Sequence, residues 1–344
     1  MTAPIVIIGS GLAAWSTVRE LRKLEALSNM ALQPITLICA DSGDFYAKPT
    51  LSNALAQKRT PAQLVTTPAA KMAETQNVTL IANTSVHKID AAARVVHTDK
   101  GDFSYDRLVM ALGASPIRVP VGGDAAHEIL SVNSISDFAA FHAKLDGAPK
   151  HVAIMGAGLI GCEFANDLVL GGHTVSVVDP APRALAALID EDTSLALQSK
   201  LAPLGVTWHF GTTVAAASQA QQGLQAYSVQ LANGKMIGAD IVLSAVGLRP
   251  NVQLAKDAGL PTDRGIVVDE LLQTSDSAIF ALGDCAQYGF VSGKTQVLPY
   301  VMPVMHASRA LASTLAGKPT PVRFPAMPVR VKTPAHPITV ASPV

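Results

Sequence analysis

Two glycine-rich loops of the same kind are the first residues that indicate chemistry. They are Gly9-Ser10-Gly11-Leu12-Ala13-Ala14 and Gly156-Ala157-Gly158-Leu159-Ile160-Gly161, and an aliphatic run, residues 5–8 or 152–155, precedes each. In such a loop the first glycine allows a tight turn, the second lets the backbone approach a pyrophosphate, and the third position must be small. The N–H groups at the start of the next helix then bind the phosphates. Two loops predict two dinucleotides.

Acidic residues after the following strands bear on which dinucleotide binds. Asp179 lies 18 residues after Gly161, where a carboxylate accepts the ribose hydroxyls and repels a 2′-phosphate, so NADH is favoured over NADPH. The alternative is a helix-capping Asp179. In the first unit Asp41 comes one residue beyond the expected strand end. Either Asp41 or the backbone of Cys39 and Ala40 then contacts the first nucleotide.

The three cysteines, Cys39, Cys162 and Cys285, are far apart in the sequence. They form no C-x-x-C or C-x4-C pair, which excludes a local redox dithiol or zinc knuckle and matches a reducing compartment. We predict no metal site, and each cysteine is expected to be a small buried residue.

Alternating strands and helices must position these loops. A strand, loop and helix span residues 5 to 27, a strand follows at 35–40, and the second unit repeats this plan with a strand at 174–179 and a helix at 190–204. A hairpin is expected near 224–236, and the segment ending at Gly113 is echoed by the one around Gly247. The chain returns with a strand at 279–284 that ends in Gly283-Asp284, and a helix is expected to begin at Pro303.

This order predicts an α/β fold with two Rossmann-like dinucleotide-binding domains, the second inserted in the first. The predicted limits are 1–117 for the first part of the outer domain and 118–250 for the inserted domain. Residues 251–322 form the second part of the outer domain, and 323–344 start a C-terminal domain.

The composition describes a globular chain with no overall charge bias. The 344 residues are 49% hydrophobic and 15% charged, with 26 basic and 26 acidic residues, which argues against a disordered or nucleic-acid-coating protein. Residues 45–73 and residues 285–344 each contain several basic residues and no Asp or Glu. If these stretches share a face they attract an acidic partner; the alternative is scattered solubilising lysines.

Nothing in the sequence predicts membrane insertion or export. No apolar run reaches the roughly 18 to 20 residues that a membrane span needs, and the N-terminus leads into the first strand without a basic region or cleavage site. We therefore expect a cytoplasmic protein.

Seven segments together resemble the rubredoxin reductases, NADH-dependent FAD enzymes of alkane-oxidising bacteria. The segments are residues 9–14, 46–52, 156–163, 247–251, 281–285, 300–303 and 331–334, and the resemblance covers essentially the whole chain. It implies a fold of the glutathione-reductase type with FAD on the first loop and NADH on the second. It also implies single-electron transfer to rubredoxin, a small acidic iron protein, that serves an alkane hydroxylase, in a monomer or homodimer.

The resemblance also implies roles for individual residues. On the FAD side these are Gly9, Gly11 and Leu12 at the pyrophosphate, Val86 at the adenine, Asp284 at or near the ribityl chain, and the Val301 backbone at the flavin N1 and O2 edge. Ser10, Gly113 and Gly283 are further residues expected to bind a cofactor. On the NADH side they are Gly156, Gly158, Gly161, Asp179 and Gly247. Lys48 and Lys332 are expected at flavin N5 and Glu163 near the nicotinamide, as catalytic residues. Without the family, these three read as surface charges.

Two alternatives to a rubredoxin reductase stay open. One is an NADH:ferredoxin reductase of an oxygenase system, and the other is a flavin-based redox sensor that binds a partner. Disulfide reductases of similar architecture need a dithiol, and His336-Pro337, which resembles their His-Pro pair, has none to serve. The family carries a further C-terminal stretch, so the C-terminal interface domain is expected to be truncated in this chain, which ends soon after Lys332.

Overall fold

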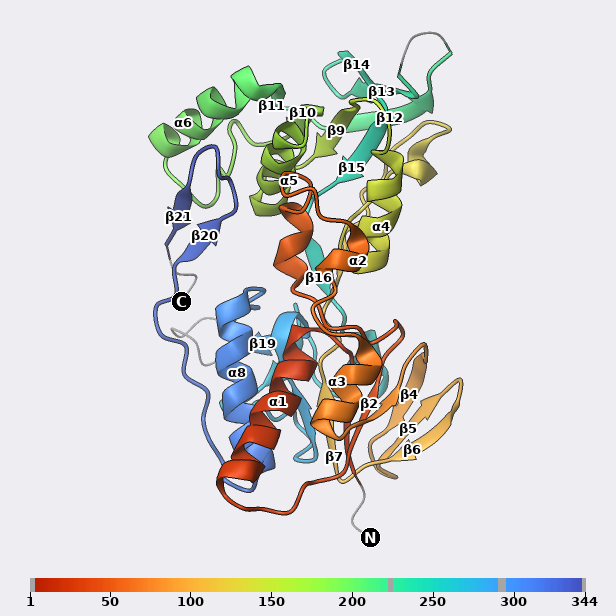
Figure 1. The fold of residues 1–344 in the computed structure, drawn as a ribbon, viewed down its shortest axis with the longest axis vertical. Coiled ribbons are helices and arrows are strands. Elements are labelled where there is room, and N and C mark those ends of the chain that lie inside the picture. The colour runs from red at the N-terminus through yellow and green to blue at the C-terminus, as the bar shows by residue number, and fades with distance from the viewer. Residues whose placement is uncertain (1–3, 222–224, 290–294, 342–344) are drawn as a thin grey trace.

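The computed structural model describes residues 4–221, 225–289 and 295–341. Two bodies are stacked along the long axis of the molecule, and the first described part of the chain, in red, lies in the lower one (Figure 1). We call them the lower body and the upper body. No helix among these residues is long and apolar enough to cross a membrane.

The lower body is built on a five-stranded parallel sheet in the order β18-β7-β1-β2-β3. Its strands are β1 (Ile5–Ile8), β2 (Ile35–Ile38), β3 (Thr79–Ile81), β7 (Arg107–Met110) and β18 (Ile279–Ala281). All four residues of β1 are buried, as expected for a central strand covered on both faces. The last strand, β18, reaches this sheet after the chain has built the upper body.

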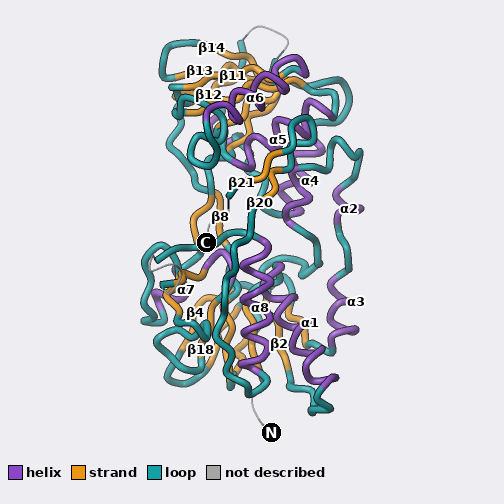
Figure 2. The backbone as a smooth tube through the Cα atoms, turned by 90° about the vertical axis from the view of Figure 1, so that its left-hand side faces the viewer, coloured by secondary structure: helices purple, strands orange, loops and turns teal. Residues whose placement is uncertain are grey.

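Helices α1 (Leu12–Leu27) and α8 (Val301–Leu315) lie side by side on this sheet (Figures 1 and 2). The Ser308 hydroxyl of α8 donates to the carbonyl of Ala13 in α1 over 3.3 Å. Both helices begin at the end of the lower body that faces the upper body. Their N-termini, and the positive ends of their dipoles, therefore point toward the junction of the two bodies.

The upper body repeats the plan with a parallel sheet in the order β11-β10-β9-β15. Its strands are β9 (His151–Met155), β10 (Thr174–Asp179), β11 (Val206–Phe210) and β15 (Ile241–Ser244), and its helices are α4 (Ile135–Lys144), α5 (Leu159–Leu170) and α6 (Glu191–Leu201). An antiparallel sheet of β12 (Val214–Gln219), β13 (Tyr227–Leu231) and β14 (Met236–Ala239) covers it. The shared strand order confirms the predicted fold class of two Rossmann-like domains.

Two of the segments in which the chain passes between the bodies are strands β8 (Ala114–Pro116) and β16 (Leu248–Pro250), which pair antiparallel. The Asn251 amide donates to the Leu112 carbonyl over 2.8 Å, and the Ser115 hydroxyl donates to Asn251 Oδ1 over 2.7 Å. Gly113 and Gly247 flank the ladder with φ of 65° and 104°, which a residue with a Cβ rarely adopts.

The remaining elements are short. They are the helices α2 (Pro61–Leu64), α3 (Ala69–Gln76) and α7 (Gln253–Asp257), the 3₁₀ helices η1 (Lys48–Ser52), η2 (Ala126–Glu128), η3 (Ala202–Leu204) and η4 (Gly283–Cys285), and the strands β4 (Val86–Asp90), β5 (Val95–Thr98), β6 (Gly101–Ser104), β17 (Ile266–Val268), β19 (Ala286–Tyr288), β20 (Val329–Val331) and β21 (Ile338–Val340).

Two segments pack on the upper body although the sequence places them outside the predicted 118–250 domain. Leu51 and Leu55, in and just after η1, are buried in its core. Val331 and Ile338 of the β20–β21 hairpin join the same core. The residues that pack into the core of the upper body therefore extend beyond the predicted limits of 118–250.

Several predicted boundaries are wrong in detail. Helix α8 begins at Val301 and not at Pro303, because Pro303 lies in the first turn, where no N–H needs a partner within the helix. Helix α6 ends at Leu201, before Pro203 in η3. The hairpin predicted near 224–236 is formed by β13 and β14, and residues 222–224 lie outside the described residues. Strand β18 ends at Ala281, so Gly283-Asp284 belongs to η4.

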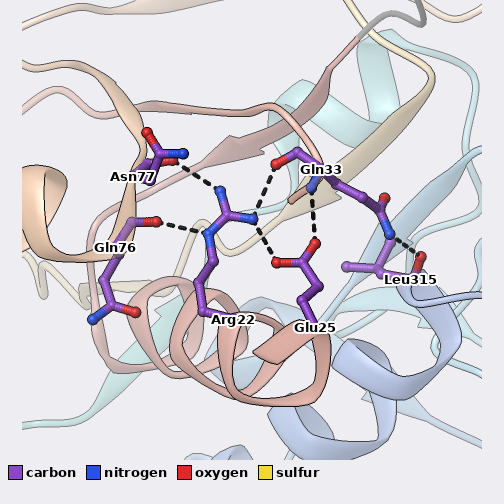
Figure 3. A network of polar contacts seen from close by, with 6 residues as sticks. All are labelled: Arg22, Glu25, Gln33, Gln76, Asn77 and Leu315. Atoms are coloured by element: carbon purple, nitrogen blue, oxygen red, sulfur yellow. Dashed lines mark hydrogen bonds and ion pairs between the residues drawn. The ribbon is translucent and has the colours of Figure 1, made fainter. Parts of the chain in front are cut away.

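A buried ion pair fastens the far end of α1 (Figure 3). Arg22 pairs with Glu25 over 2.8 Å, and its guanidinium also donates to the carbonyls of Gln76, Gln33 and Asn77. Glu25, which is 0% exposed, accepts the Gln33 N–H over 2.9 Å. This network orders the long connection between α1 and β2 at the end of the lower body remote from the junction.

Candidate functional site

The first glycine loop has the geometry that a dinucleotide pyrophosphate needs. Gly9 has a φ of 115°, and a Cβ there would overlap the Ala111 carbonyl. Gly11 is the N-cap of α1, and a Cβ on it would meet no protein atom within 4 Å. No side chain caps α1, whereas Ser134 and Asp190 cap α4 and α6. The first N–H groups of α1, starting at Leu12, can therefore bind phosphate oxygens.

The second loop repeats these features at α5. Gly156 has a φ of 104°, and a Cβ there would lie 2.6 Å from the Ala245 carbonyl oxygen. Gly158 is an N-cap without a side-chain cap, and a Cβ on it would again meet nothing within 4 Å. A Cβ on Gly161 would overlap the Gly156 carbonyl, which is why the third position must be glycine here. The residues of both loops fit a dinucleotide.

Each predicted ribose-binding acid is hydrogen-bonded to its own loop. Asp179 accepts the N–H groups of Ala157 and Ala181 over 2.6 and 2.7 Å. Asp41 accepts the Ser10 hydroxyl over 2.6 Å and the Gly43 N–H over 3.0 Å. Each carboxylate thus ties a strand end to its glycine loop, and each retains lone pairs for a ribose hydroxyl.

The backbone at the end of β2 is partly engaged in hydrogen bonds within the protein. The N–H of Cys39 donates to the Ile81 carbonyl over 3.1 Å, and its own carbonyl accepts the Thr84 N–H over 2.8 Å. The Cys39 backbone is therefore already used within the protein, while Ala40 and Asp41 are exposed. Contact with a nucleotide is left to these two residues, as a prediction.

Three segments meet where the predicted flavin would lie. Gly283, with a φ of 79°, packs against the start of α1, since a Cβ there would lie 3.0 Å from the Ala13 Cβ and 3.9 Å from Val304. Asp284 follows it in η4, and Val301 opens α8 with 40% of its surface exposed. The start of α8 thus presents N–H groups and apolar surface together, as a flavin ring edge requires. Val86, the first residue of β4, is half-buried.

Lys48 and Asp284 influence each other across this junction. Burial raises the pKa of Asp284, and the Lys48 charge opposes that rise. The pKa of Lys48 is lowered by desolvation, which the charges of Asp284, Asp137 and Asp41 oppose. Lys48 nevertheless remains accessible to solvent, and its ammonium donates a hydrogen bond to Asn133 Oδ1 over 3.4 Å. Lys48 from η1 and Asp284 from η4 thus bring one cation and one carboxylate to the junction of the two bodies.

Glu163 and Lys332, predicted to act separately, are in contact. The Lys332 ammonium forms an ion pair with Glu163 Oε2, and the Lys332 N–H donates to Oε1 over 3.0 Å. Ser52 Oγ donates to Oε2 over 2.7 Å. Because Glu163 is only 2% exposed, these bonds compensate a buried charge. The Lys332 ammonium is therefore already paired with a carboxylate of the protein. Its predicted place at flavin N5 stays a prediction.

Sequence reasoning missed several polar residues at this junction. Ser52 binds Glu163, Asn133 binds Lys48, and the Tyr46 hydroxyl accepts the Ile135 N–H over 3.1 Å. Tyr46 and Ser52 lie in one of the segments that carry the family resemblance, so a signal for them existed. Asn133 lies in none of those segments.

Comparison with known proteins decides the family. Residues 3–311 match the family described as Pyridine nucleotide-disulphide oxidoreductase, and residues 321–344 match the Rubredoxin binding C-terminal domain. The chain belongs to the pyridine nucleotide-disulphide oxidoreductase family. It is 46% identical to the rubredoxin-NAD(+) reductase of Acinetobacter baylyi, over 95% of this chain and 81% of that protein.

Two further relatives place the chain within this family. It is 42% identical to a nitric oxide reductase FlRd-NAD(+) reductase of Aeromonas salmonicida, covering 95% of this chain and 80% of that protein. It superimposes with a TM-score of 0.86 on the crystal structure of the covalent putidaredoxin reductase-putidaredoxin complex, at 28% identity, covering 96% of this chain and 79% of that one. The predicted resemblance to rubredoxin reductases is confirmed.

The family membership makes the protein an oxidoreductase with FAD and NADH as cofactors. The residues of both glycine loops fit these groups, as described above. Which residue contacts which part of each cofactor stays a prediction.

The cysteines distinguish this member from those that use a dithiol. All three thiols are free and buried, and burial is the largest of the effects that raise the pKa of each to about 12. A thiol with such a pKa is a poor nucleophile at neutral pH. Within the described ranges, no group of three or more His, Cys, Asp or Glu residues could hold a metal ion.

Proposed function

We propose that this protein is an NADH:rubredoxin oxidoreductase, with FAD on the first glycine loop and NADH on the second. The observation that carries the proposal is the pair of helices α1 and α5 that lack a side-chain cap and follow glycine loops of similar geometry. The match of residues 321–344 to a rubredoxin-binding domain supports rubredoxin as the acceptor.

FAD supplies the chemistry when bound, because it accepts a hydride from NADH and releases electrons one at a time. The protein positions the two cofactors and tunes their electrostatics. In our proposal the start of α8 stabilises negative charge at the N1 and O2 edge, and Asp284 accepts a hydrogen bond from the ribityl chain. Lys48 lies toward N5, and Glu163 orients the nicotinamide.

NADH is preferred over NADPH in this proposal. Asp179 lies at the end of β10, where its charge repels a 2′-phosphate. The nearby Arg183 guanidinium donates to the carbonyls of Ile189 and Asp190 over 2.8 and 3.2 Å. These bonds orient the guanidinium toward the segment that precedes α6, and they use its Nη1 hydrogens but not those of Nε and Nη2.

A reductase for a [2Fe–2S] ferredoxin is the second candidate, favoured by the structural likeness to putidaredoxin reductase. A redox-sensing binding protein is the third. Service to an alkane hydroxylase, a cytoplasmic location, and a monomeric or homodimeric state are further predictions of the same proposal.

The decisive experiment is an absorption spectrum of the purified protein followed by anaerobic titration with NADH. We expect bound flavin whose absorption bleaches. Reduced protein is then mixed with rubredoxin or with a [2Fe–2S] ferredoxin in a stopped-flow instrument. Faster oxidation by rubredoxin supports the proposal, faster oxidation by ferredoxin favours the second candidate, and slow oxidation by both favours the sensor.

A further inference from the structure

Helix α5 carries three buried polar residues on one face. Glu163, Asn166 and Asp167 stand at positions i, i+3 and i+4, so they are neighbours on the helix surface. Their exposed fractions are 2%, 1% and 2%. A buried polar stripe is costly unless every group has a partner, so the partners reveal what it does.

All three residues of this α5 stripe accept hydrogen bonds from segments far away in the chain. Asn166 Oδ1 accepts the Ala335 N–H over 3.1 Å, beside the Lys332 N–H that Glu163 accepts. These two residues hold the C-terminal hairpin. Asp167 faces a different segment.

Asp167 holds the chain just after η1 by its backbone. Its two carboxylate oxygens accept the N–H groups of Leu55 and Ala56 over 3.0 and 2.9 Å. Burial raises the pKa of Asp167, and these backbone hydrogen bonds oppose the rise. None of the ion pairs found among the described residues includes Asp167, so backbone amides are what compensates its charge.

The segment that Asp167 holds is also the one that carries Lys48. Lys48 opens η1, Ser52 closes it and binds Glu163, and Leu55 is buried in the core of the upper body. Lys48 is thus fixed to the upper body by the packing of its segment. Asp284, whose negative charge opposes the lowering of the Lys48 pKa, belongs to the lower body. The position of Lys48 at the junction depends on what anchors residues 48–56 to α5.

We propose that Asp167 is a positioning residue that, through the backbone of Leu55 and Ala56, sets the place of Lys48 beside the flavin. It acts through Lys48 and does not touch a cofactor. The inference rests on the proposed function for one point only, namely that Lys48 faces the flavin. Its first consequence, that Asp167 orders residues 48–56, is independent of that function.

The test compares Asp167→Asn with Lys48→Met and with a matched control, Glu25→Gln. Glu25 is also a buried carboxylate that accepts a backbone N–H, but it lies in the remote network of Figure 3. In the protein as purified we expect D167N to speed amide exchange at Leu55 and Ala56 about tenfold relative to wild type, because each loses a charge-assisted bond. E25Q is expected to leave these two amides unchanged.

The second readout is the absorption spectrum and midpoint potential of bound FAD. We expect D167N to shift the potential in the same direction as K48M, and the double variant to shift it no further than K48M alone. E25Q should retain the wild-type potential, although it lowers stability. If D167N does not fold, Asp167→Glu, which keeps the charge but displaces the carboxylate, is measured in its place with the same expectations.

Two outcomes overturn the inference, and they are distinguishable. If K48M shifts the flavin potential and D167N does not, Asp167 is merely structural and the proposed function stands. If K48M itself has the wild-type potential, Lys48 is removed from the proposed function and the role of Asp167 through it falls as well.

Discussion

At the scale of single residues, the glycines of each loop divide into two kinds. A Cβ on Gly161 would overlap the Gly156 carbonyl, whereas a Cβ on Gly158 would meet no protein atom within 4 Å. One glycine is thus required by the fold, and the other is required only when a cofactor is bound. A pair of substitutions separates these two requirements.

We expect Gly158→Ala to keep the wild-type melting temperature and to weaken NADH binding roughly tenfold or more, a loss of about 1.4 kcal/mol. The added methyl group occupies space into which the pyrophosphate would fit. Gly161→Ala should instead lower the melting temperature, because the helix must move off its strand. Thermal unfolding and NADH titration measure both effects. A large loss of stability in G158A would contradict this assignment.

The buried Glu163 charge makes a second prediction at this scale. Lys332→Met removes the cation but leaves the hydrogen bonds from Ser52 Oγ and the residue 332 N–H, so we expect destabilisation by about 1–3 kcal/mol in urea unfolding. The double variant K332M/E163Q should recover part of this loss, since no buried charge is then left unpaired. Additive effects of the two substitutions would argue against the ion pair.

At the scale of elements, two histidines couple the upper sheet to pH. His151 in β9 lies 2.8 Å from Thr174 Oγ1 and 3.0 Å from Ser176 Oγ, and desolvation lowers its pKa. Desolvation, and then the Lys235 charge, lower the pKa of His209 in β11. Both imidazoles therefore bind a proton less readily in the folded sheet than in the unfolded chain.

The sign of the pH dependence follows from these lowered pKa values. Below the usual histidine pKa of 6.5 the unfolded chain binds protons that the folded protein resists, so stability falls as the pH drops from 6.5 toward the lowered values. We expect the free energy of unfolding to be lower at pH 5.5 than at pH 7.5, and His151→Gln to reduce that difference. Urea unfolding at the two pH values checks this, and a pH-independent wild type would contradict it.

Elements also show what the sequence can and cannot predict. The strand–loop–helix units around Gly9 and Gly156 could be predicted, because their signals are local: aliphatic runs, glycine spacing and a following helix. The start of α8 was misplaced by two residues, because a proline is tolerated throughout the first turn. Contacts of η1 and of the β20–β21 hairpin with α5 could not be predicted, since they join residues more than 100 positions apart.

The polar partners of the candidate site follow the same rule. Glu163 and Lys332 could be named from the family resemblance, but their mutual ion pair depends on where the C-terminal hairpin packs. Asp167 carries no motif at all. Its hydrogen bonds join residues 112 and 111 positions apart, so no local signal in the sequence predicts them.

At the scale of the whole molecule, the predicted basic stretches are partly neutralised. Arg309 and Arg323 pair with Glu20 and Glu270 over 3.6 and 3.3 Å, and Lys71 pairs with Glu74 over 2.9 Å. Lys294 lies outside the described residues. Arg330 is exposed on β20, inside the segment that matches a rubredoxin-binding domain, and none of the described ion pairs includes it.

We therefore expect the kcat/KM for an acidic rubredoxin to fall with rising salt, while reduction of ferricyanide by NADH changes little. Arg330→Glu should lower kcat/KM for rubredoxin several-fold at low salt. Lys71→Glu on α3, an exposed lysine of the first basic stretch, is the control and should have a smaller effect. Equal effects of R330E and K71E would point to net charge and not to a docking position.

Strand β18 joins the lower sheet only after the chain has built the upper sheet. This determines the order in which the two sheets can be completed during synthesis on the ribosome. The upper sheet has all its strands once residue 244 has emerged, but the lower sheet waits for residues 279–281 and its helix α8 for residues 301–315. The sheet that begins first is thus completed last. During synthesis the glycine loop at residues 9–14 is present long before the segments around Gly283 and Val301 that are predicted to surround its cofactor, so the nascent chain can form the upper sheet before the lower one.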